Sequence, residues 1–495
     1  MLPFATLLQL TTATSTPLYV QLSQQLGQLI RAGTLAAGQR LPGSRLLAAQ
    51  LAINRLTVVA AYDDLLAQGW LSSRGGSGTF VADHLPEPAP QSIHNQVVNP
   101  TVQPGYTFAS RPHLKVPVRN SPAGLRFDDG LPDARLAPLD ELSGAYRSYS
   151  RWGNKQAHFG YADTHGHPFL REQLAQHLNE TRGLQIGPAN VLITRGTVMG
   201  IHLVCQTLLR PGDVLVTGGI TWTTASMNAQ QAGARVLTVP VDEHGLDVDA
   251  LADLCARQPV RMVYITPHHH YPTTVTLRAD RRLRLLQLAD QYGFALFEDD
   301  YDYDFHYLGR PILPLASADR HGMVVYVGSM TKSVAPAFRV GYVVAPSALI
   351  DELARLRRII DRQGDPALEF AIGQLFETGE MKRHFRKALR TYLGRRDHIA
   401  QLLSSELAND LSFTKPDGGL ALWATFRPDV DLPALAEQAA SLGLSLSSGL
   451  PHVRPGQQPH SIRMGFASST EAELEQAVAI LKRVTMGPNN KASRR

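Results

Sequence analysis

From residue 125 onward, short runs of β-branched and aromatic residues alternate with helical patterns. The runs include VLVTGG, ARVLTVPV, VRMVYITP, FALFEDD and VVYVGS, and helix-length segments separate most of them. Runs that are apolar throughout suit strands buried on both faces, and intervening helices suit parallel pairing. The sequence therefore predicts an α/β domain at residues 125–486, with a mostly parallel sheet covered by helices on both faces.

Three further segments have different patterns. Residues 1–82 are predicted to form a small module of short helices closed by a glycine-rich hairpin. Residues 83–124 contain repeated prolines without sustained periodicity, which is typical of an extended linker. The tail at 487–495, GPNNKASRR, is expected to be disordered.

The N-terminal module contains two short helical segments joined by a tight corner. In residues 55–70, Val58, Ala61, Tyr62 and Leu65 repeat at the spacing of one buried helical face. The preceding helix, SRLLAAQL, is separated from it by only three residues, AIN. This arrangement predicts a helix-turn-helix, in which the start of the second helix enters the major groove.

The segments PLYVQLSQQLGQLIRAG, GQRLPGSRLLAAQLAINRLTVVAAYDDLLAQGW and RGGSGTFVA together resemble the GntR-type winged helix-turn-helix. The resemblance implies DNA contacts by Arg45, Arg55 and Thr57. An arginine such as Arg55 can bond guanine O6 and N7 together. Arg74 and Ser77, at the hairpin tip, are expected to reach phosphate or the minor groove. The alternative is a helical dimerisation or capping module.

The large domain contains a lysine on a short turn between two β runs. In YVGSMTKSVAPAFRVGYVVAP, Ser329 and Lys332 follow one run and Arg339 precedes the next. Pyridoxal phosphate (PLP) requires such a lysine for its aldehyde, a carboxylate for its ring nitrogen, a stacking aromatic and an anion site. Asp299 ends an earlier strand, where α/β sheets hold ligands. The lysine and the carboxylate together favour a PLP site.

This pattern resembles the fold-type I aminotransferases, and in particular the MocR group of GntR regulators. The resemblance implies that Lys332 forms a Schiff base with PLP, that Asp299 faces the ring nitrogen and that Tyr301 bonds the ring hydroxyl. It implies that Ser329 and Arg339 bind the phosphate. The other residues that it implicates are Gly196, Thr197 and Val198 at the phosphate, Trp222 on the ring, Tyr161 at the partner subunit's phosphate, Tyr271 and Pro272 in a family turn, and Arg463 on an effector carboxylate.

Charge, histidine and cysteine content bear on DNA binding, metal binding and location in the cell. The net charge is +5, and the first 83 residues carry five arginines against three aspartates, a weak basic excess that permits DNA binding without requiring it. Three adjacent histidines, His268–His270, cannot all face one ion, so no metal is expected. Two cysteines without metal spacing, and no long apolar run, favour a cytoplasmic protein outside the membrane.

The leading hypothesis is a PLP-dependent, DNA-binding transcription regulator. It would act as a homodimer on double-stranded operator DNA and sense an amino-acid-like effector. One alternative is a working aminotransferase with a secondary DNA-binding domain; whether a regulator retains partial transaminase activity stays open. In the other, PLP itself, a form of vitamin B6, is the effector. A working aminotransferase has no evident use for an N-terminal segment that carries a specific DNA-reading motif, so a regulator is preferred. The regulator that senses PLP differs from the leading hypothesis only in its effector.

Overall fold

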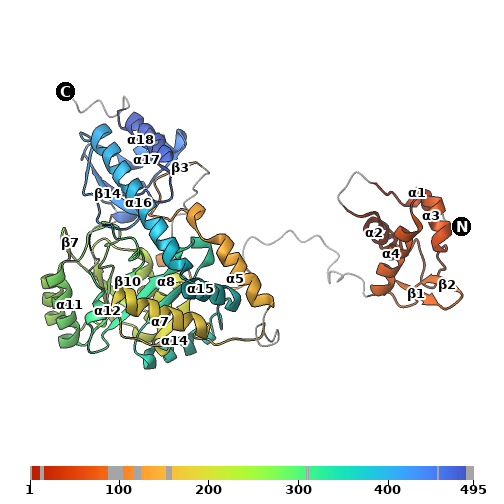
Figure 1. Ribbon diagram of the computed structural model, residues 1–495, viewed down its shortest axis with the longest axis horizontal. Helices are drawn as coiled ribbons and strands as arrows, with labels where there is room; N and C mark the ends of the chain where they lie inside the picture. Colours follow the sequence, from red (N-terminus) through yellow and green to blue (C-terminus); the bar gives the residue numbers. More distant parts are fainter. Residues whose placement is uncertain are drawn as a thin grey trace. The chain divides into compact units, whose positions relative to one another are not determined.

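The computed structural model describes residues 3–11, 16–86, 104–114, 124–151, 159–307, 309, 312–453 and 456–486. The chain divides into two compact units, Met1–Ala109 and Ser110–Arg495 (Figure 1). The predicted tail and most of the predicted linker lie outside the described residues. Within the linker segment, the 3-10 helix η1 (Pro112–Leu114) belongs to the second unit, where His113 hydrogen-bonds to Gln231 at 3.2 Å.

The first unit is a small helical module with a hairpin. Its elements are α1 (Phe4–Leu7), α2 (Leu18–Arg31), α3 (Ser44–Leu51), α4 (Arg55–Ala67), β1 (Leu71–Arg74) and β2 (Gly78–Val81). The strands pair antiparallel, with Arg74 opposite Gly78 at the tip. Asn54 caps α4, because its side chain accepts a hydrogen bond from the Leu56 amide at 2.8 Å. The order of helix, corner, helix and hairpin is that of a winged helix-turn-helix.

The core of this unit forms around one face of α4. The four residues predicted for that face, Val58, Ala61, Tyr62 and Leu65, are the buried residues of the helix, which confirms the predicted stripe. The Tyr62 hydroxyl donates to the Pro42 carbonyl at 2.8 Å, so the aromatic side chain is buried without leaving its polar end unpaired. The buried face of α4 packs against α2 and α3, and the start of α4 stays at the surface.

The second unit is built on a seven-stranded sheet with the strand order β4-β12-β11-β10-β9-β5-β6. The strands are β4 (Val191–Thr194), β5 (Val214–Gly218), β6 (Arg235–Val239), β9 (Met262–Ile265), β10 (Ala295–Asp300), β11 (Val324–Ser329) and β12 (Gly341–Val344). All neighbours pair parallel except β12, which is antiparallel to both β11 and β4. The predicted mostly parallel sheet is confirmed.

Helices cover both faces of this sheet, as two separate apolar clusters show. The helices of the unit before the C-terminal part are α5 (Leu139–Arg151), α7 (Pro168–Arg182), α8 (Gly196–Leu208), α9 (Thr223–Gln231), α10 (Val248–Arg257), α11 (Ala279–Tyr292), α12 (Leu315–Ala318), α13 (Met330–Ser333), α14 (Ser347–Arg358) and α15 (Pro366–Glu377). Residues of α8, α9 and α14 pack on one face, and residues of α7, α10, α11 and α15 on the other. One short strand pair and three 3-10 helices complete this part of the unit: β7 (Val241–Asp242), β8 (Gly245–Leu246), η2 (Ala134–Leu136), η3 (Pro188–Asn190) and η4 (Pro336–Phe338).

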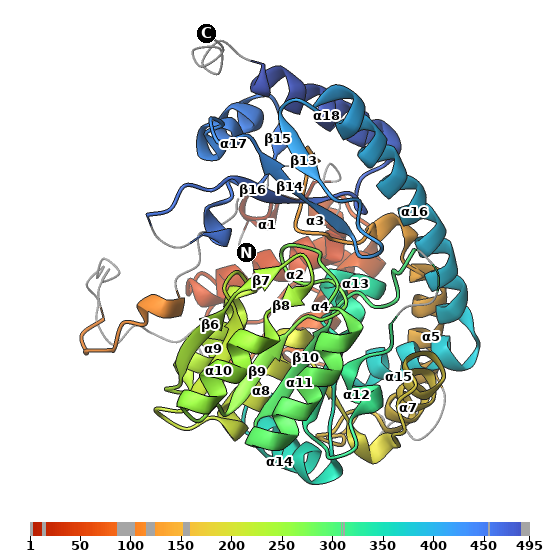
Figure 2. The same ribbon diagram turned by 90° about the vertical axis from the view of Figure 1, so that its left-hand side faces the viewer.

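A smaller C-terminal layer packs beside the large sheet (Figure 2). It contains β13 (Leu411–Phe413), β14 (Ala421–Phe426) and β16 (Ser461–Gly465) in one antiparallel sheet, with α16 (Glu380–Glu406), α17 (Leu432–Ser441), α18 (Glu471–Thr485) and η5 (Leu450–His452). Here β15 (Leu444–Ser445) pairs with β3 (Leu125–Arg126) from the start of the unit. The loop after β3 reaches the turn that follows β11, where the Gly130 carbonyl accepts a hydrogen bond from Lys332. Among the described residues, no helix is long and apolar enough to cross a membrane.

Candidate functional site: a pocket at the strand ends and a helix-turn-helix face

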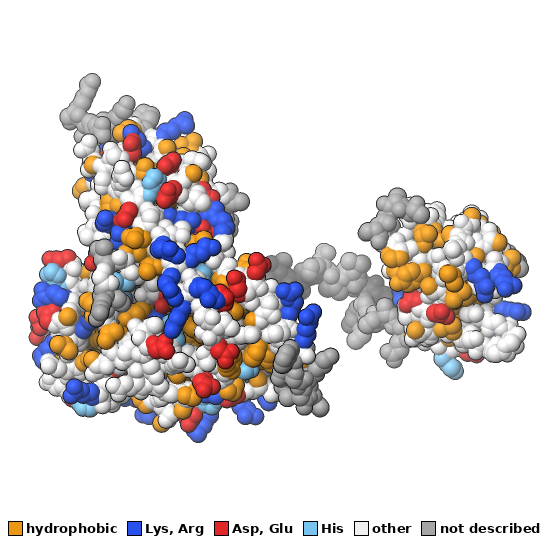
Figure 3. Space-filling model, in the orientation of Figure 1, with side chains coloured by type: hydrophobic (Ala, Val, Ile, Leu, Met, Phe, Trp, Pro, Cys, Tyr) orange, Lys and Arg blue, Asp and Glu red, His pale blue; other side chains and the backbone are white. Residues whose placement is uncertain are grey.

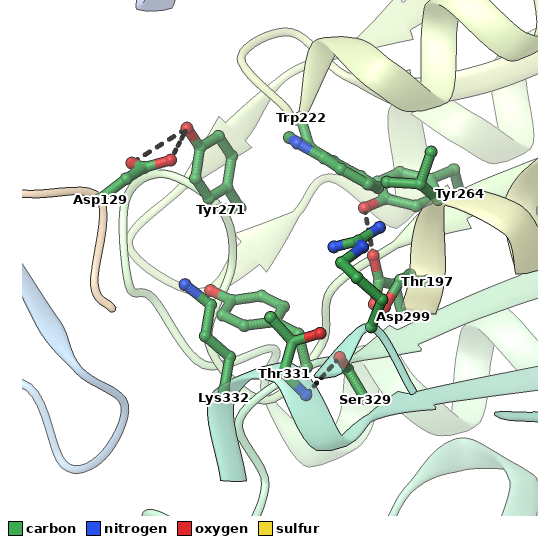
Figure 4. A pocket seen from close by; sticks show the side chains of 12 residues that line it. Asp129, Thr197, Trp222, Tyr264, Tyr271, Asp299, Ser329, Thr331 and Lys332 are labelled. Carbon is green, nitrogen blue, oxygen red and sulfur yellow. Dashed lines mark hydrogen bonds between the residues drawn. The ribbon is translucent and has the colours of Figure 1, made fainter. Parts of the chain in front are cut away.

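A pocket in the second unit lies beyond the carboxyl ends of β9, β10 and β11, beside the start of α8 (Figure 4). Such sheet edges are the usual ligand sites of α/β folds. Its lining consists of Asp129, Thr197, Val198, Trp222, Tyr264, Tyr271, Asp299, Tyr301, Ser329, Thr331, Lys332 and Arg339. The pocket thus gathers every cofactor residue expected from the sequence except Gly196, which adjoins it, and Tyr161.

Lys332 lies on α13, the single turn of helix that follows β11. Ser329 begins this turn, and its hydroxyl accepts a hydrogen bond from the Thr331 amide at 3.1 Å. The Lys332 ammonium donates to the Gly130 carbonyl at 2.5 Å. Burial lowers the pKa of Lys332. A lowered pKa increases the share of neutral amine, which is the form that reacts with an aldehyde.

Asp299 lies on β10 with its carboxylate in the pocket. One oxygen accepts a hydrogen bond from the Tyr264 hydroxyl at 2.8 Å, while the other, Oδ1, is buried and has no partner among the described residues. Burial raises the pKa of Asp299 to about 7. A cationic ring nitrogen would satisfy the unpaired oxygen and stabilise the charged carboxylate. The environment of Asp299 therefore fits the pyridine nitrogen of PLP.

A second cluster suits a phosphate. Gly196, the first residue of α8, has φ +73°, and a side chain there would approach the Arg339 guanidinium at 3.2 Å. Thr197, Ser329 and Arg339 line the adjoining wall. Amides at the start of a helix, joined by a guanidinium and hydroxyls, form an anion site. The cluster fits the phosphate of the same cofactor.

Two aromatic side chains of the expected set also line the pocket. Trp222 precedes α9 and lies on the same side as Tyr264 and Asp299, across from Lys332 (Figure 4). The Tyr301 hydroxyl donates to the His269 carbonyl at 2.8 Å, and its oxygen lies 3.5 Å from the donor Nη2 of Arg463, which leaves one further lone pair as an acceptor. Trp222 can therefore cover a planar ring that Asp299 and Tyr301 contact at its edge.

Arg463 and Tyr161 do not line the pocket. The Arg463 side chain is buried behind Tyr271, and its guanidinium donates to the Pro272 carbonyl at 3.0 Å. Tyr161 is 82% exposed, and the Arg362 guanidinium lies over its ring. Their expected roles, at an effector carboxylate and at a partner subunit's phosphate, stay predictions.

Four lining residues were not assigned a role from the sequence: Asp129, Tyr264, Tyr271 and Thr331. Thr331 adjoins Lys332, so proximity in sequence could have indicated it. Tyr271 was noted only as part of a family turn, and Tyr264 lies within an ordinary buried strand. Asp129 comes from a loop 142 residues before Tyr271, whose hydroxyl donates to it at 2.9 Å. No local pattern indicates such a pair.

The three adjacent histidines have separate partners. His269 pairs with Asp302 at 2.7 Å, and His268 with Asp300 at 3.2 Å. His270 contacts the Thr273 hydroxyl at 3.0 Å, and burial lowers its pKa to about 4. Their side chains are thus buried and form hydrogen bonds or ion pairs with separate partners.

In the first unit, the residues expected to contact DNA lie at the start of α4, on α3 and on the hairpin. Arg45 and Arg55 are exposed and Thr57 is half-buried; the Arg55 guanidinium lies 3.4 Å from the Ser44 hydroxyl. Arg74 is exposed and pairs with Asp83 at 2.9 Å, and Ser77 is exposed at the hairpin tip. In the face shown in Figure 3, basic side chains gather at one side of this unit.

Family models match both units. The model described as bacterial regulatory proteins, gntR family, matches residues 18–81, and the model for aminotransferase class I and II matches residues 132–481. The second match alone covers more than half of the chain.

Known regulatory proteins match the chain along nearly their whole length. A probable rhizopine catabolism regulatory protein, MocR, of Rhizobium meliloti is 29% identical, over 95% of this chain and 97% of that protein. The transcriptional regulator TauR of Rhodobacter capsulatus is 30% identical, over 94% of this chain and 95% of that protein. Among solved structures, the α-aminoadipate aminotransferase LysN of Thermus thermophilus, complexed with N-(5'-phosphopyridoxyl)-L-leucine, is 25% identical and has a TM-score of 0.68, covering 73% of this chain and 92% of that one.

Proposed function

The chain belongs to the MocR-type GntR transcription regulators, which join a GntR-type winged helix to a class I and II aminotransferase domain, and we propose that its aminotransferase pocket holds PLP and senses an effector. The observation that carries the proposal is the buried Oδ1 of Asp299, which lies in the same pocket as Lys332 and has no partner in the part of the chain that the structure describes. A buried carboxylate oxygen without a partner is costly, so a cationic ligand group is expected there.

Each part of the pocket would hold one part of PLP. Lys332 would bind the aldehyde carbon, Asp299 the ring nitrogen and Tyr301 the ring hydroxyl. Trp222 would cover the ring face, while Gly196, Thr197, Val198, Ser329 and Arg339 would surround the phosphate. When bound, PLP supplies an aldehyde that combines reversibly with primary amines. The LysN complex, in which a phosphopyridoxyl group is joined to leucine, supports such a ligand on this fold.

The first unit would bind operator DNA. Arg55 and Thr57 at the start of α4 would contact base edges, with Arg45 on α3 beside them. Arg74 and Ser77 on the hairpin would contact the backbone or the minor groove. One winged helix contacts few base pairs, so a homodimer that places two of them on one operator would supply the specificity. The exposed Tyr161 would then reach the phosphate site of the partner subunit.

Regulation would follow from unequal binding. A ligand in the pocket shifts DNA binding only if it binds two arrangements of the dimer with different affinity. By linkage, operator DNA must change the affinity for the ligand by the same factor. The effector would be an amino-acid-like amine that combines with the cofactor and whose carboxylate binds Arg463, or PLP itself.

Sequencing the DNA fragments that the purified chain selects, with and without PLP, tests this function. We expect enrichment of a short, two-fold symmetric site whose recovery changes when PLP is present. Recovery of random fragments at moderate salt in both conditions would contradict operator-specific regulation. If PLP alters recovery and no amine does so further, PLP itself is the effector.

A further inference from the structure

A leucine at the start of α4 exposes most of its side chain. Of the large apolar residues described in the first unit, Leu56 is the most exposed, at 72%, and the next reaches only 44%. Isolated apolar side chains are common on protein surfaces and need no ligand. The start of α4, however, is the part of a helix-turn-helix that enters the major groove. Leu56 therefore lies where its exposure can serve direct contact with DNA.

The geometry of α4 directs Leu56 away from the core. Successive residues of an α-helix are turned by about 100°, so Leu56 and Val58, two positions apart, lie on nearly opposite sides. Val58 belongs to the buried face that packs against α2 and α3. The backbone at Leu56 is held in place, because its amide donates to the Asn54 side chain at 2.8 Å and this bond caps the helix. The leucine side chain consequently projects into solvent from a fixed point.

The surface around Leu56 is basic. Arg55 precedes it on α4, and Arg45 is exposed on α3. Among the residues described in this unit, the only ion pair joins Arg74 to Asp83, so the other two arginines are not neutralised by a carboxylate. One leucine flanked by cations offers little apolar area to a protein partner, whose interfaces bury about 800 Å² on each side. It suits a polyanion that presents isolated methyl groups.

DNA is such a polyanion. Each thymine presents its 5-methyl group in the major groove, and contact of an apolar side chain with this methyl distinguishes thymine from the other bases. Successive helix residues rise by about 1.5 Å and successive base pairs by about 3.4 Å. A base contacted by Leu56 therefore lies within about two base pairs of one contacted by Arg55.

We propose that Leu56 is a specificity-determining residue of the DNA-binding face and selects a thymine, by contact with its 5-methyl group, within two base pairs of the one that Arg55 contacts. The proposal rests on the proposed function, since it requires α4 to enter the major groove of an operator. It adds the identity of one base in each half-site. Loss of one buried methyl group should weaken binding about fourfold.

Deoxyuridine substitution in a selected operator tests the proposal. Deoxyuridine pairs with adenine as thymidine does and lacks only the 5-methyl group. The PLP-loaded, full-length protein first selects an operator from random DNA, and each thymine of the two half-sites is then replaced in turn. We expect one thymine position whose replacement weakens wild-type binding about fourfold per half-site. The slope of affinity against salt should not change, because a methyl group releases no counterions.

Three variants separate the methyl contact from other roles. Leu56→Ala removes the contacting methyl groups from an exposed helical position, where alanine is well tolerated. Leu56→Asn keeps nearly the same size and replaces the methyl groups by an amide. Both should bind the thymine and deoxyuridine operators within about twofold of each other. Leu283→Ala, which removes a 60% exposed leucine from α11 of the second unit, should discriminate as the wild type does.

A wild-type protein that is insensitive to every deoxyuridine replacement would overturn the proposal. So would wild-type discrimination that persists in Leu56→Ala or in Leu56→Asn, and either variant suffices if the other does not fold. Failure of the wild type to select any operator would contradict the proposed function instead. A selected operator without a methyl-sensitive thymine would contradict only the role of Leu56.

Discussion

Replacing Asp299 by asparagine should stabilise the cofactor-free protein at neutral pH and weaken PLP binding. Folding raises the pKa of this carboxyl group from 3.8 to about 7, chiefly by burial. The folded chain then binds more protons than the unfolded chain between these values, so this group lowers the free energy of unfolding as the pH rises through that window. Each pH unit corresponds to about 1.4 kcal/mol. Asparagine does not titrate and lacks this dependence.

The magnitude follows from the width of the window. Between about pH 5 and pH 7, cofactor-free wild type should lose about 2 kcal/mol of unfolding free energy relative to Asp299→Asn, since the group is half-titrated at the upper end of this range. The cost of the unpaired asparagine amide, about 1–3 kcal/mol, is the same at every pH and cancels in this comparison. Bound PLP reverses the preference, because the variant loses a hydrogen bond between charged groups worth about 1.5–3 kcal/mol, or about 10-fold to 150-fold in affinity.

Urea unfolding of both cofactor-free proteins across this pH range measures the first effect, and equilibrium dialysis with PLP measures the second. Glu298, whose pKa burial also raises to about 7, titrates in both proteins and does not distort their difference. Parallel stability profiles would refute the argument that the Asp299 carboxylate is destabilised by burial. Equal PLP affinity would refute its placement at the ring nitrogen.

Three other predictions address separate parts of the account. Lys332→Ala should lose the borohydride-reduced PLP adduct that peptide mapping finds in the wild type; a label on another lysine would contradict the assignment. Arg55→Ala should cost about 1–3 kcal/mol of operator binding and relax the sequence preference, whereas Arg74→Ala should weaken binding to all sequences alike and reduce the salt dependence in filter-binding titrations. Identical behaviour of the two variants would mean that Arg55 does not contact bases. Sedimentation should show a dimer at micromolar concentration with PLP, and Tyr161→Phe should lower PLP affinity in the dimer; a monomeric PLP-bound species would contradict a shared site.

The sequence predicted the fold wherever burial follows a regular period. The stripe on α4 repeats every three to four residues, and the strands of the large sheet are apolar throughout, so both were identifiable without tertiary information. The direction of β12 was not identifiable, because GYVV has the composition of a parallel strand. Its antiparallel pairing depends on the short return through Lys332 and Arg339, which leaves no room for a crossover helix.

The pocket was predictable to the extent that its residues follow strand ends. Lys332, Ser329 and Asp299 were found in this way, because parallel strands bring their carboxyl ends to one edge. Asp129 was not found, because it lies on the loop after β3, 142 positions before its pocket partner Tyr271, and not at the end of a strand of the large sheet. The burial of Arg463 likewise depends on residues far from it in sequence, such as Pro272, which lies 191 positions before it.

The central claim is that ligand binding at Lys332 is coupled to DNA binding by the first unit. The direct measurement is the affinity for a selected operator fragment in the cofactor-free protein, in the PLP-loaded protein, and in the PLP-loaded protein with candidate amino acids, alongside Lys332→Ala under the same conditions. The account predicts that operator affinity in the wild type changes by about 5-fold to 150-fold between at least two of these states, and that Lys332→Ala shows no such change. Operator affinity that stays constant in all three states, while Lys332 carries PLP, would contradict it.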